Sequence, residues 1–199
     1  MPTINPTPEQ MESRIVRAKK IQPFKIGMEK LHGIPPEALE AISAKTIYLY
    51  MNPPRGDWTD KLAGVAGSPG LQVSVCHCPP GQGPELHAHE RTVENFFCLK
   101  GEFNIVWGDD GQFSTTLDEH DMISMPPKVM RRFTNTSAED AILLVLIQGP
   151  DSDLSTDVQY APSLGASFAE KYGPQVRMEI ENMGWRFDAE LGSRVEADA

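Results

Sequence analysis

Eight short apolar segments between residues 46 and 150 constrain the fold more than any other feature of the sequence. Each is four to eight residues long and is separated from the next by turn residues. Segments of this length and spacing are typical of strands in an antiparallel sandwich or barrel. We therefore expect an all-β core. The predicted strands cover residues 47–51, 71–78, 96–99, 103–107, 113–117, 122–125, 130–134 and 141–147.

The residues before these strands have a helical pattern. Thr7-Pro8-Glu9-Gln10 combines a capping hydroxyl, a proline at the first helical position and a glutamine three residues after the cap. This pattern predicts a helix that runs to about residue 20. The sequence Pro35-Pro36-Glu37 predicts a second helix that ends near residue 45. We assign residues 1–45 to a helical N-terminal extension.

The strand pattern stops after Pro150, so residues 46–150 are predicted to form a β-barrel. A helix is expected over residues 163–172, with the Ser163 hydroxyl as its cap. Residues 191–199 are small and polar, which is typical of disordered chain ends. Residues 151–199 are accordingly expected to be a C-terminal extension with a disordered tail. Between two strands, Gly108-Asp109-Asp110-Gly111 predicts a hairpin turn, because Asp and Gly tolerate positive φ angles.

Acidic residues dominate the charge of the chain. The 28 Asp and Glu residues against 18 Lys and Arg give a formal net charge of −10, which argues against nucleic acids and anionic membranes as partners. No apolar segment is as long as a membrane span, and the first residues lack a signal-peptide pattern. We expect a cytoplasmic protein whose partner is a small-molecule substrate, with no nucleic acid and no membrane. Its three cysteines predict reduced thiols rather than a disulfide framework.

The segment from Gly81 to Gly101 contains the most informative group of residues. Side chains alternate between the faces of a strand, so His87 and His89 would project from the same face and could reach one metal ion. A turn then leads into a strand that is expected to begin at Glu94, which brings its carboxylate beside the two imidazoles. Two histidines and one carboxylate form a facial ligand set with open positions, which suits non-haem Fe(II) oxygenases.

This segment resembles the first motif of the cupin superfamily, G-x5-H-x-H-x4-E-x6-G, which is met at every fixed position. The second motif, G-x5-P-x-G-x2-H-x3-N, is met in part. Arg131 stands at its histidine, so the family's fourth metal ligand is missing. Its two glycines are replaced by His120 and Lys128, whereas Pro126 and Asn135 fit. The resemblance covers about residues 70–150.

The resemblance implies a cupin jelly-roll β-barrel with helical N- and C-terminal extensions and a site inside the barrel. It also implies a cupin-type metalloprotein, which we expect to be a non-haem metal-dependent dioxygenase acting on a small anionic organic substrate. His87, His89 and Glu94 would bind a divalent metal, with Fe(II) favoured over Mn, Ni or Zn. Arg131 would be the catalytic residue that orients the anionic group of the substrate.

Cupin-like barrels commonly pair, so the resemblance also implies a homodimer. The charge is +2 on residues 1–70, −6 on residues 71–150 and −6 on residues 151–199, so the N-terminal segment could lie on the acidic body of its own chain or on a neighbouring subunit.

A site without metal is the alternative, and the residues leave it open. In that site an internal ion pair between Glu94 and Arg131 would substitute for the metal ion. Such a protein could be an isomerase or epimerase in which His87 or His89 abstracts a proton and Arg131 stabilises the oxyanion. It could also be a binding module for small molecules without catalytic activity.

Other side chains could line the same cavity. Cys98 and Phe96 share the strand face of Glu94, and Phe133 and Trp107 could add to the wall, so Phe96, Cys98 and Phe133 are predicted to bind substrate together with Arg131. Cys76 and Cys78 share a face opposite His77, so they are expected to be core or pocket thiols rather than ligands of one ion. His32 and His120 belong to no convergent group and are expected at the surface or in turns.

Overall fold

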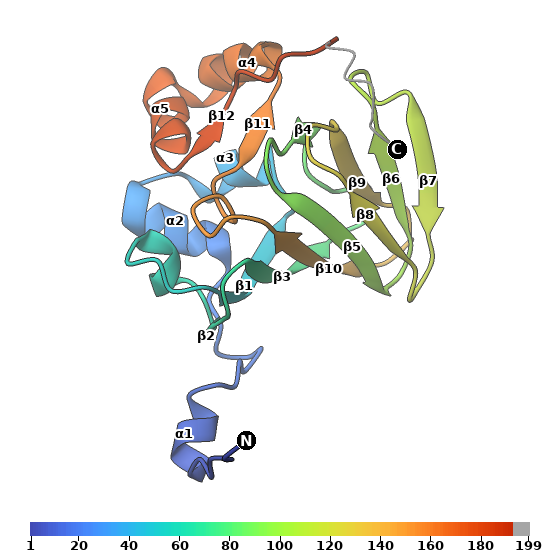
Figure 1. Cartoon of the computed structure of the whole chain (residues 1–199). Coiled ribbons are helices and arrows are strands. Elements are labelled where there is room, and N and C mark those ends of the chain that lie inside the picture. Colours follow the sequence, from blue (N-terminus) through green and yellow to red (C-terminus); the bar gives the residue numbers. More distant parts are fainter. Residues whose placement is uncertain (193–199) are drawn as a thin grey trace.

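A computed structural model describes residues 1–192 and has two six-stranded sheets that face each other (Figure 1). The strands are β1 (Thr46–Asn52), β2 (Val65–Ala66), β3 (Leu71–Cys78), β4 (His87–Ala88), β5 (Val93–Lys100), β6 (Phe103–Trp107), β7 (Phe113–Leu117), β8 (Met122–Met125), β9 (Arg131–Asn135), β10 (Ala141–Gln148), β11 (Val158–Tyr160) and β12 (Trp185–Arg186). The first sheet has the order β2-β1-β3-β10-β5-β8 and the second β12-β11-β4-β9-β6-β7. This arrangement confirms the expected all-β jelly-roll fold.

All eight predicted strands are present, and four of them match residue for residue. The predicted hairpin joins β6 to β7, and Gly108 and Gly111 take φ angles of 97° and 65° there. The prediction that the strand pattern stops after Pro150 is wrong, because β11 and β12 extend the second sheet. These strands have three and two residues, too few for an alternating pattern. Pairing with β4 holds β11 in place.

The N-terminal extension contains α1 (Pro8–Glu12), α2 (Phe24–His32) and α3 (Pro36–Glu40). The helix α1 begins as predicted, with the reciprocal Thr7–Gln10 capping box, but it ends at Glu12 rather than near residue 20. None of its residues is buried, and a short helix without packing is marginal in water. The helix α3 also ends early, and the sequence patterns do not indicate α2. A short 3₁₀ helix, η1 (Trp58–Lys61), follows β1.

The C-terminal extension contains α4 (Pro162–Tyr172) and α5 (Pro174–Asn182). The helix predicted over residues 163–172 is therefore present, but Ser163 is not its cap. Ala161 is the N-cap, and Pro162 takes the first helical position, where a missing N–H costs little. Of the tail expected to be disordered, residues 193–199 lie outside the described residues. None of the helices in residues 1–192 has the length and apolar character needed to cross a membrane.

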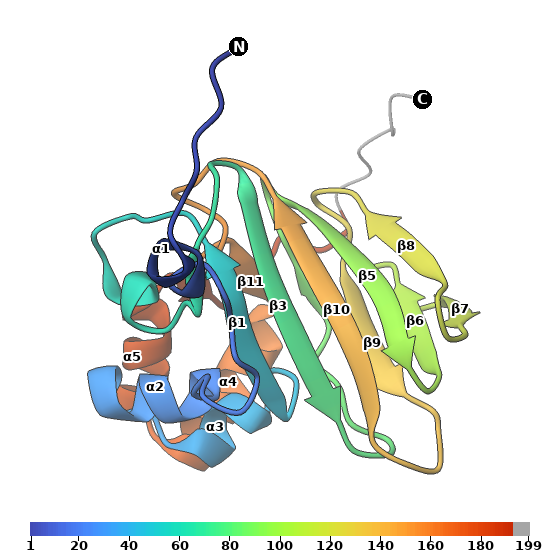
Figure 2. The ribbon, with the colours of Figure 1, turned by 90° about the horizontal axis from the view of Figure 1, so that it is seen from below.

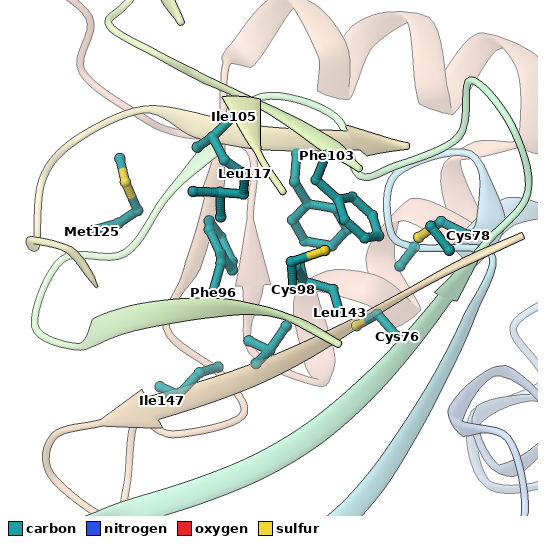
Figure 3. Close-up of a cluster of buried hydrophobic side chains, with 14 of the residues drawn as sticks. Cys76, Cys78, Phe96, Cys98, Phe103, Ile105, Leu117, Met125, Leu143 and Ile147 are labelled. Carbon is teal, nitrogen blue, oxygen red and sulfur yellow. The ribbon is translucent and has the colours of Figure 1, made fainter. Parts of the chain in front are cut away.

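The space between the sheets has two halves, and we call the first the packed half. It is filled by apolar side chains from both sheets (Figure 3). The Phe133 ring lies edge-on to the rings of Phe96 and Phe103, with centroids 5.2 and 5.8 Å away. Cys76 and Cys78 are buried in the same cluster whereas His77 is exposed, as the strand alternation predicts.

We call the second half the cavity half, because the two extensions cover it without filling it. Figure 2 shows α2, α3, α4 and α5 gathered beside β1 and β11, away from β6, β7 and β8. A second apolar cluster connects Phe24 of α2 and Ile42 with Tyr160 and Trp185. The cavity half therefore depends on chain segments that lie far apart in the sequence.

Candidate metal centre

His87, His89 and Glu94 converge in the cavity half from the two facing sheets. His87 lies on β4, His89 follows β4 directly, and Glu94 is the second residue of β5. Each histidine Nε2 lies 3.7 Å from the same Glu94 oxygen, Oε2. All three ligand atoms lie within 4.8 Å of one another, and all three side chains are at least nine-tenths buried. The predicted convergence is confirmed, although β4 ends at Ala88 and β5 begins one residue before Glu94.

The hydrogen bonds of the two rings fix which nitrogen carries the proton. Nδ1 of His87 lies 2.8 Å from the carbonyl oxygen of Glu85, which can only accept, so this Nδ1 is the donor. Nδ1 of His89 lies 2.7 Å from Oγ1 of Thr92. That hydroxyl donates its own proton to Asp157 Oδ2 at 3.1 Å, so it must accept from His89. In the neutral form of each ring, the Nε2 lone pair therefore faces Glu94.

This arrangement fits a cation. Two Nε2 lone pairs and a carboxylate oxygen face one another, and Nε2 of His89 has no hydrogen-bond partner among the described residues. Burial, reinforced by Arg131, holds the pKa of His89 well below its ordinary value, so this ring remains neutral. Burial opposes the ionisation of Glu94, but the charged Arg131 guanidinium that donates to its carboxylate outweighs this effect, so the pKa of Glu94 lies well below its ordinary value. Neutral imidazoles and an ionised carboxylate are the forms that bind metal.

Arg131 lies behind Glu94. Its Nε donates to Glu94 Oε2 at 3.0 Å, and its Nη1 donates to the carbonyl oxygen of Val129 at 3.0 Å. Nη2 has no partner among the described residues, and the side chain is fully buried. Burial lowers the pKa of Arg131 and Glu94 opposes that shift, so the guanidinium remains charged. The ion pair that the alternative interpretation expects is therefore present.

Asp157, from the C-terminal extension, anchors the loop that carries His89. Its carboxylate accepts from the backbone N–H groups of Glu90, Arg91 and Thr92 at 2.8 to 2.9 Å and from the Thr92 hydroxyl. A continuous chain of hydrogen bonds thus runs from Asp157 through Thr92 to His89. Such outer partners orient a ligating imidazole and fix its tautomer. No sequence signal points to Asp157, because it lies more than sixty residues from the loop that it holds.

A cavity of about 100 Å³ lies beside the three converging side chains. Phe133 lines it, as predicted, whereas Phe96 and Cys98 lie in the packed half and are not among the lining residues. Arg131 does not line it either, so the expected direct contact with substrate is not part of this arrangement. Trp107 stacks on Phe113 instead of lining the cavity. Within residues 1–192, Glu94 is the only lining residue with a formal charge at neutral pH.

Both extensions supply lining residues that the sequence patterns do not indicate. Phe24 comes from α2, and Ser155, Tyr160 and Trp185 come from the C-terminal extension. Tyr160 pairs with His87 across the strands, and its hydroxyl donates to the carbonyl oxygen of Ile42 at 3.1 Å. Burial raises the pKa of this phenol, so it stays protonated and forms part of the cavity wall.

The cysteines and the remaining histidines do not join the centre. Burial raises the pKa of Cys76 and raises that of Cys78 to about 12, so both remain thiols rather than metal-binding thiolates. Cys98 donates its S–H to the carbonyl oxygen of Gly101. His120 is exposed in a turn with a φ of 75°, as expected, and His32 packs edge-on against Trp58.

The model of the cupin domain family matches residues 74–147, a little over a third of the chain. Among solved structures, BH2720 from Bacillus halodurans is 18 % identical over 43 % of this chain and 67 % of its own, with a TM-score of 0.40. TT1209 from Thermus thermophilus is 25 % identical over 43 % of this chain and 78 % of its own, with a TM-score of 0.39. KdgF from Halomonas sp. is 20 % identical over 43 % and 74 %, with a TM-score of 0.39. None of the curated proteins compared with the chain matches it.

Proposed function

We propose that this chain, which contains a cupin domain at residues 74–147, is a metal-dependent cupin enzyme that acts on a small anionic organic substrate. Dioxygenase chemistry at Fe(II) is the reaction that we favour. His87, His89 and Glu94 would hold the ion, and Fe(II) would supply open coordination positions for dioxygen chemistry. The cavity would hold the substrate and exclude water. Arg131 would act through Glu94 by keeping its carboxylate ionised and oriented.

The observation that carries this proposal is the pair of Nε2 lone pairs that face Glu94 Oε2 at 3.7 Å. Both Nδ1 atoms donate hydrogen bonds, so a neutral ring cannot present an Nε2 proton to the carboxylate without losing its existing hydrogen bond. Without a cation, the buried Nε2 of His89 has no partner among the described residues and loses its hydration without compensation. A divalent ion removes this conflict.

The balance of charges supports an anionic substrate. Arg131 already balances Glu94, so a divalent ion would bring two positive charges that no other lining residue in the described chain compensates. A carboxylate or enolate in the cavity would neutralise part of this charge. The remaining walls are largely apolar, which favours a small organic body over a sugar-like one.

Metal content tests the proposal directly. Protein purified without a histidine tag or chelator, then exposed anaerobically to Fe(II), Mn(II), Ni(II) or Zn(II), should retain about one ion per chain. The variant His89→Ala should lose it, whereas His77→Ala should keep it, because His77 is exposed on the opposite face of β3. Oxygen consumption that depends on Fe(II) and on added small carboxylates would then support the dioxygenase. Wild-type protein that retains none of these ions would contradict the proposal.

A metal-free isomerase or epimerase is the second candidate, and the buried Arg131–Glu94 pair favours it. In this case His87 or His89 would take a proton from the substrate through its free Nε2. Incorporation of deuterium from deuterated water into a bound substrate, at a rate that chelators do not change, would support the metal-free enzyme. The expected homodimer remains a proposal for either function, and light scattering at micromolar concentration tests it.

A further inference from the structure

A polar cluster lies on the cavity wall away from the three converging side chains. It consists of Gln72 and Ser74 on β3 and Ser155 in the C-terminal extension. The Ser155 hydroxyl donates to the Gln72 amide oxygen at 2.5 Å, and the Gln72 amide nitrogen lies 3.4 Å from the Ser74 hydroxyl. Gln72 and Ser74 are only 6 % and 4 % exposed. The residues around the cluster on the same wall are apolar, so its position needs a reason.

The cluster has more donor hydrogens than its internal bonds use. One amide and two hydroxyls offer four donor hydrogens, and two contacts join them to one another. Two donor hydrogens therefore have no acceptor among the described residues, whichever way the amide is turned. Buried donors without acceptors are costly, and a ligand oxygen at this point would satisfy them.

The pairing of the strands gives the distance between this cluster and the metal centre. Gln72 is paired with Ile147 on β10, and Ile147 is paired with Glu94 on β5, so the three residues lie in one row across the sheet. Two strand spacings separate the Cα atoms of Gln72 and Glu94 by roughly 10 Å. The side chains of Gln72 and Glu94 both line the cavity between these backbones, so a molecule with a few carbon atoms between two polar ends can reach from one to the other.

We propose that Gln72, Ser74 and Ser155 form a second subsite that binds a neutral oxygen acceptor, such as a carbonyl, at the far end of the substrate. This proposal rests on the proposed function, since the anionic end of the substrate would lie at the metal. A second carboxylate is disfavoured at this end, because no cationic side chain of residues 1–192 lines the cavity beside the cluster to compensate a buried negative charge. The substrate is then a short organic anion with an apolar middle and a distal carbonyl.

Matched acids test the subsite on Zn(II)-loaded protein by calorimetry. 4-Oxopentanoate carries a carbonyl where 4-methylpentanoate carries a methyl group, and pentanedioate carries a second carboxylate. The oxo acid should bind about tenfold more tightly than the methyl acid, the value of one good hydrogen bond. It should also bind more tightly than the diacid. Equal affinities for the oxo and methyl acids would overturn the proposal.

Single substitutions test which side chains cause the preference for the oxo acid over the methyl acid. Ser74→Ala and Ser155→Ala should each reduce the preference for the oxo acid toward unity. The matched control is Ser43→Ala, because Ser43 also lines the cavity but its hydroxyl already donates to the carbonyl oxygen of Leu39 at 2.8 Å. The preference should survive in this control. A preference that survives in both Ser74→Ala and Ser155→Ala would also overturn the subsite.

A neutral probe separates the subsite from the metal. Pentan-2-one has no carboxylate, so its binding does not need the ion, and it should shift the side-chain amide signal of Gln72 in nitrogen-15 spectra of the metal-free protein. The hydrocarbon 2-methylpentane should not. Suppose that pentan-2-one shifts this signal, but that wild-type protein retains none of the added metal ions in the metal-content test. The proposed function then fails and the subsite stands. If pentan-2-one leaves the signal unchanged, the subsite is wrong.

Discussion

The packed half and the cavity half lie between the same two sheets but are built in different ways. The packed half is closed mainly by side chains of strands between residues 71 and 148, joined by Ala44 and Leu154. The cavity half is closed by α2, β11 and β12, which come from the two ends of the chain. Apolar contacts dominate the packed half, whereas the cavity half also holds buried polar atoms, Nε2 of His89 among them, that have no hydrogen-bond partner among the described residues. The difference predicts that substitutions in the two halves have separable effects on stability and on binding.

The largest effect on stability is expected in the packed half, from Phe103→Ala. The Phe103 ring is fully buried and packs edge-on against Phe133. Its removal should lower the free energy of unfolding by about 3 to 5 kcal/mol and leave metal affinity unchanged. Urea unfolding and metal titration measure the two quantities. Phe113→Ala is the control, because that ring is 53 % exposed on the adjacent strand. A change in metal affinity that matches the stability loss would show that the halves are not separable.

Arg131→Met tests the point where the two halves meet. In the metal-free protein it leaves the Glu94 carboxylate buried without its partner, which should cost about 3 kcal/mol. With Zn(II) bound the loss should be much smaller, because the ion compensates the same charge. Arg132→Met is the control, since Arg132 is exposed on the same strand. A loss that is equally large with and without Zn(II) would favour the metal-free site.

Arg131→His extends this test. It restores a histidine at the position where the second cupin motif has one, so it should tighten metal binding while it impairs turnover. Two results together would support a metal-free site held by the Arg131–Glu94 ion pair. These are unchanged or weaker metal affinity in Arg131→His, and a loss of stability in Arg131→Met that is the same with and without Zn(II).

Features of the fold that depend on a local pattern are predictable from the sequence. The segment that forms β3 is predicted to the residue, because Gly70 with a φ of 83° and Pro79 bound an unbroken run of strand-forming residues. The three metal-binding candidates are identifiable because they lie within eight residues of one another, on β4, directly after it and at the start of β5. The start of α1 is predictable for the same reason, since its capping box spans four residues.

Features that depend on distant segments of the chain are not predictable in this way. The end of α1 depends on whether anything packs against it, and none of its residues is buried. The strands β11 and β12 exist through pairing with β4 and with each other rather than through an intrinsic pattern. Phe96 and Cys98 share the strand face of Glu94, but the cavity ends before it reaches them, because Phe133 and Phe103 fill that region. A face assignment cannot show where a cavity ends.

Asp157→Asn should weaken the cavity half without a comparable effect on the packed half. The amide has one acceptor oxygen in place of two, so the loop of residues 90–92 loses part of its anchor, and the Thr92 hydroxyl loses a charged acceptor. Metal affinity should fall by about ten- to a hundredfold, as is typical for outer partners of a ligating histidine. The loss of stability should be about 1 kcal/mol. Asp188→Asn, at an exposed position of the same extension, is the control. Equal metal affinity in wild type and Asp157→Asn would show that His89 does not depend on this chain of hydrogen bonds.

The smallest predicted effect is a loss of stability of the metal-free protein between pH 7.5 and 5.5. Burial holds the pKa of His89 well below 6.5, the ordinary value that applies to the unfolded chain. In this window the unfolded state therefore binds a proton that the folded state does not, so stability falls as the pH is lowered. One such group lowers the free energy of unfolding by about 1 kcal/mol between pH 7.5 and pH 5.5. Urea unfolding at both pH values should show this loss in wild type and a smaller one in His89→Gln, which cannot take up the proton. The pKa of Glu94 is also depressed, but its effect begins only below its unfolded value of 4.5 and lies outside this window. A pH dependence that is the same in wild type and His89→Gln would assign the titration to groups other than His89.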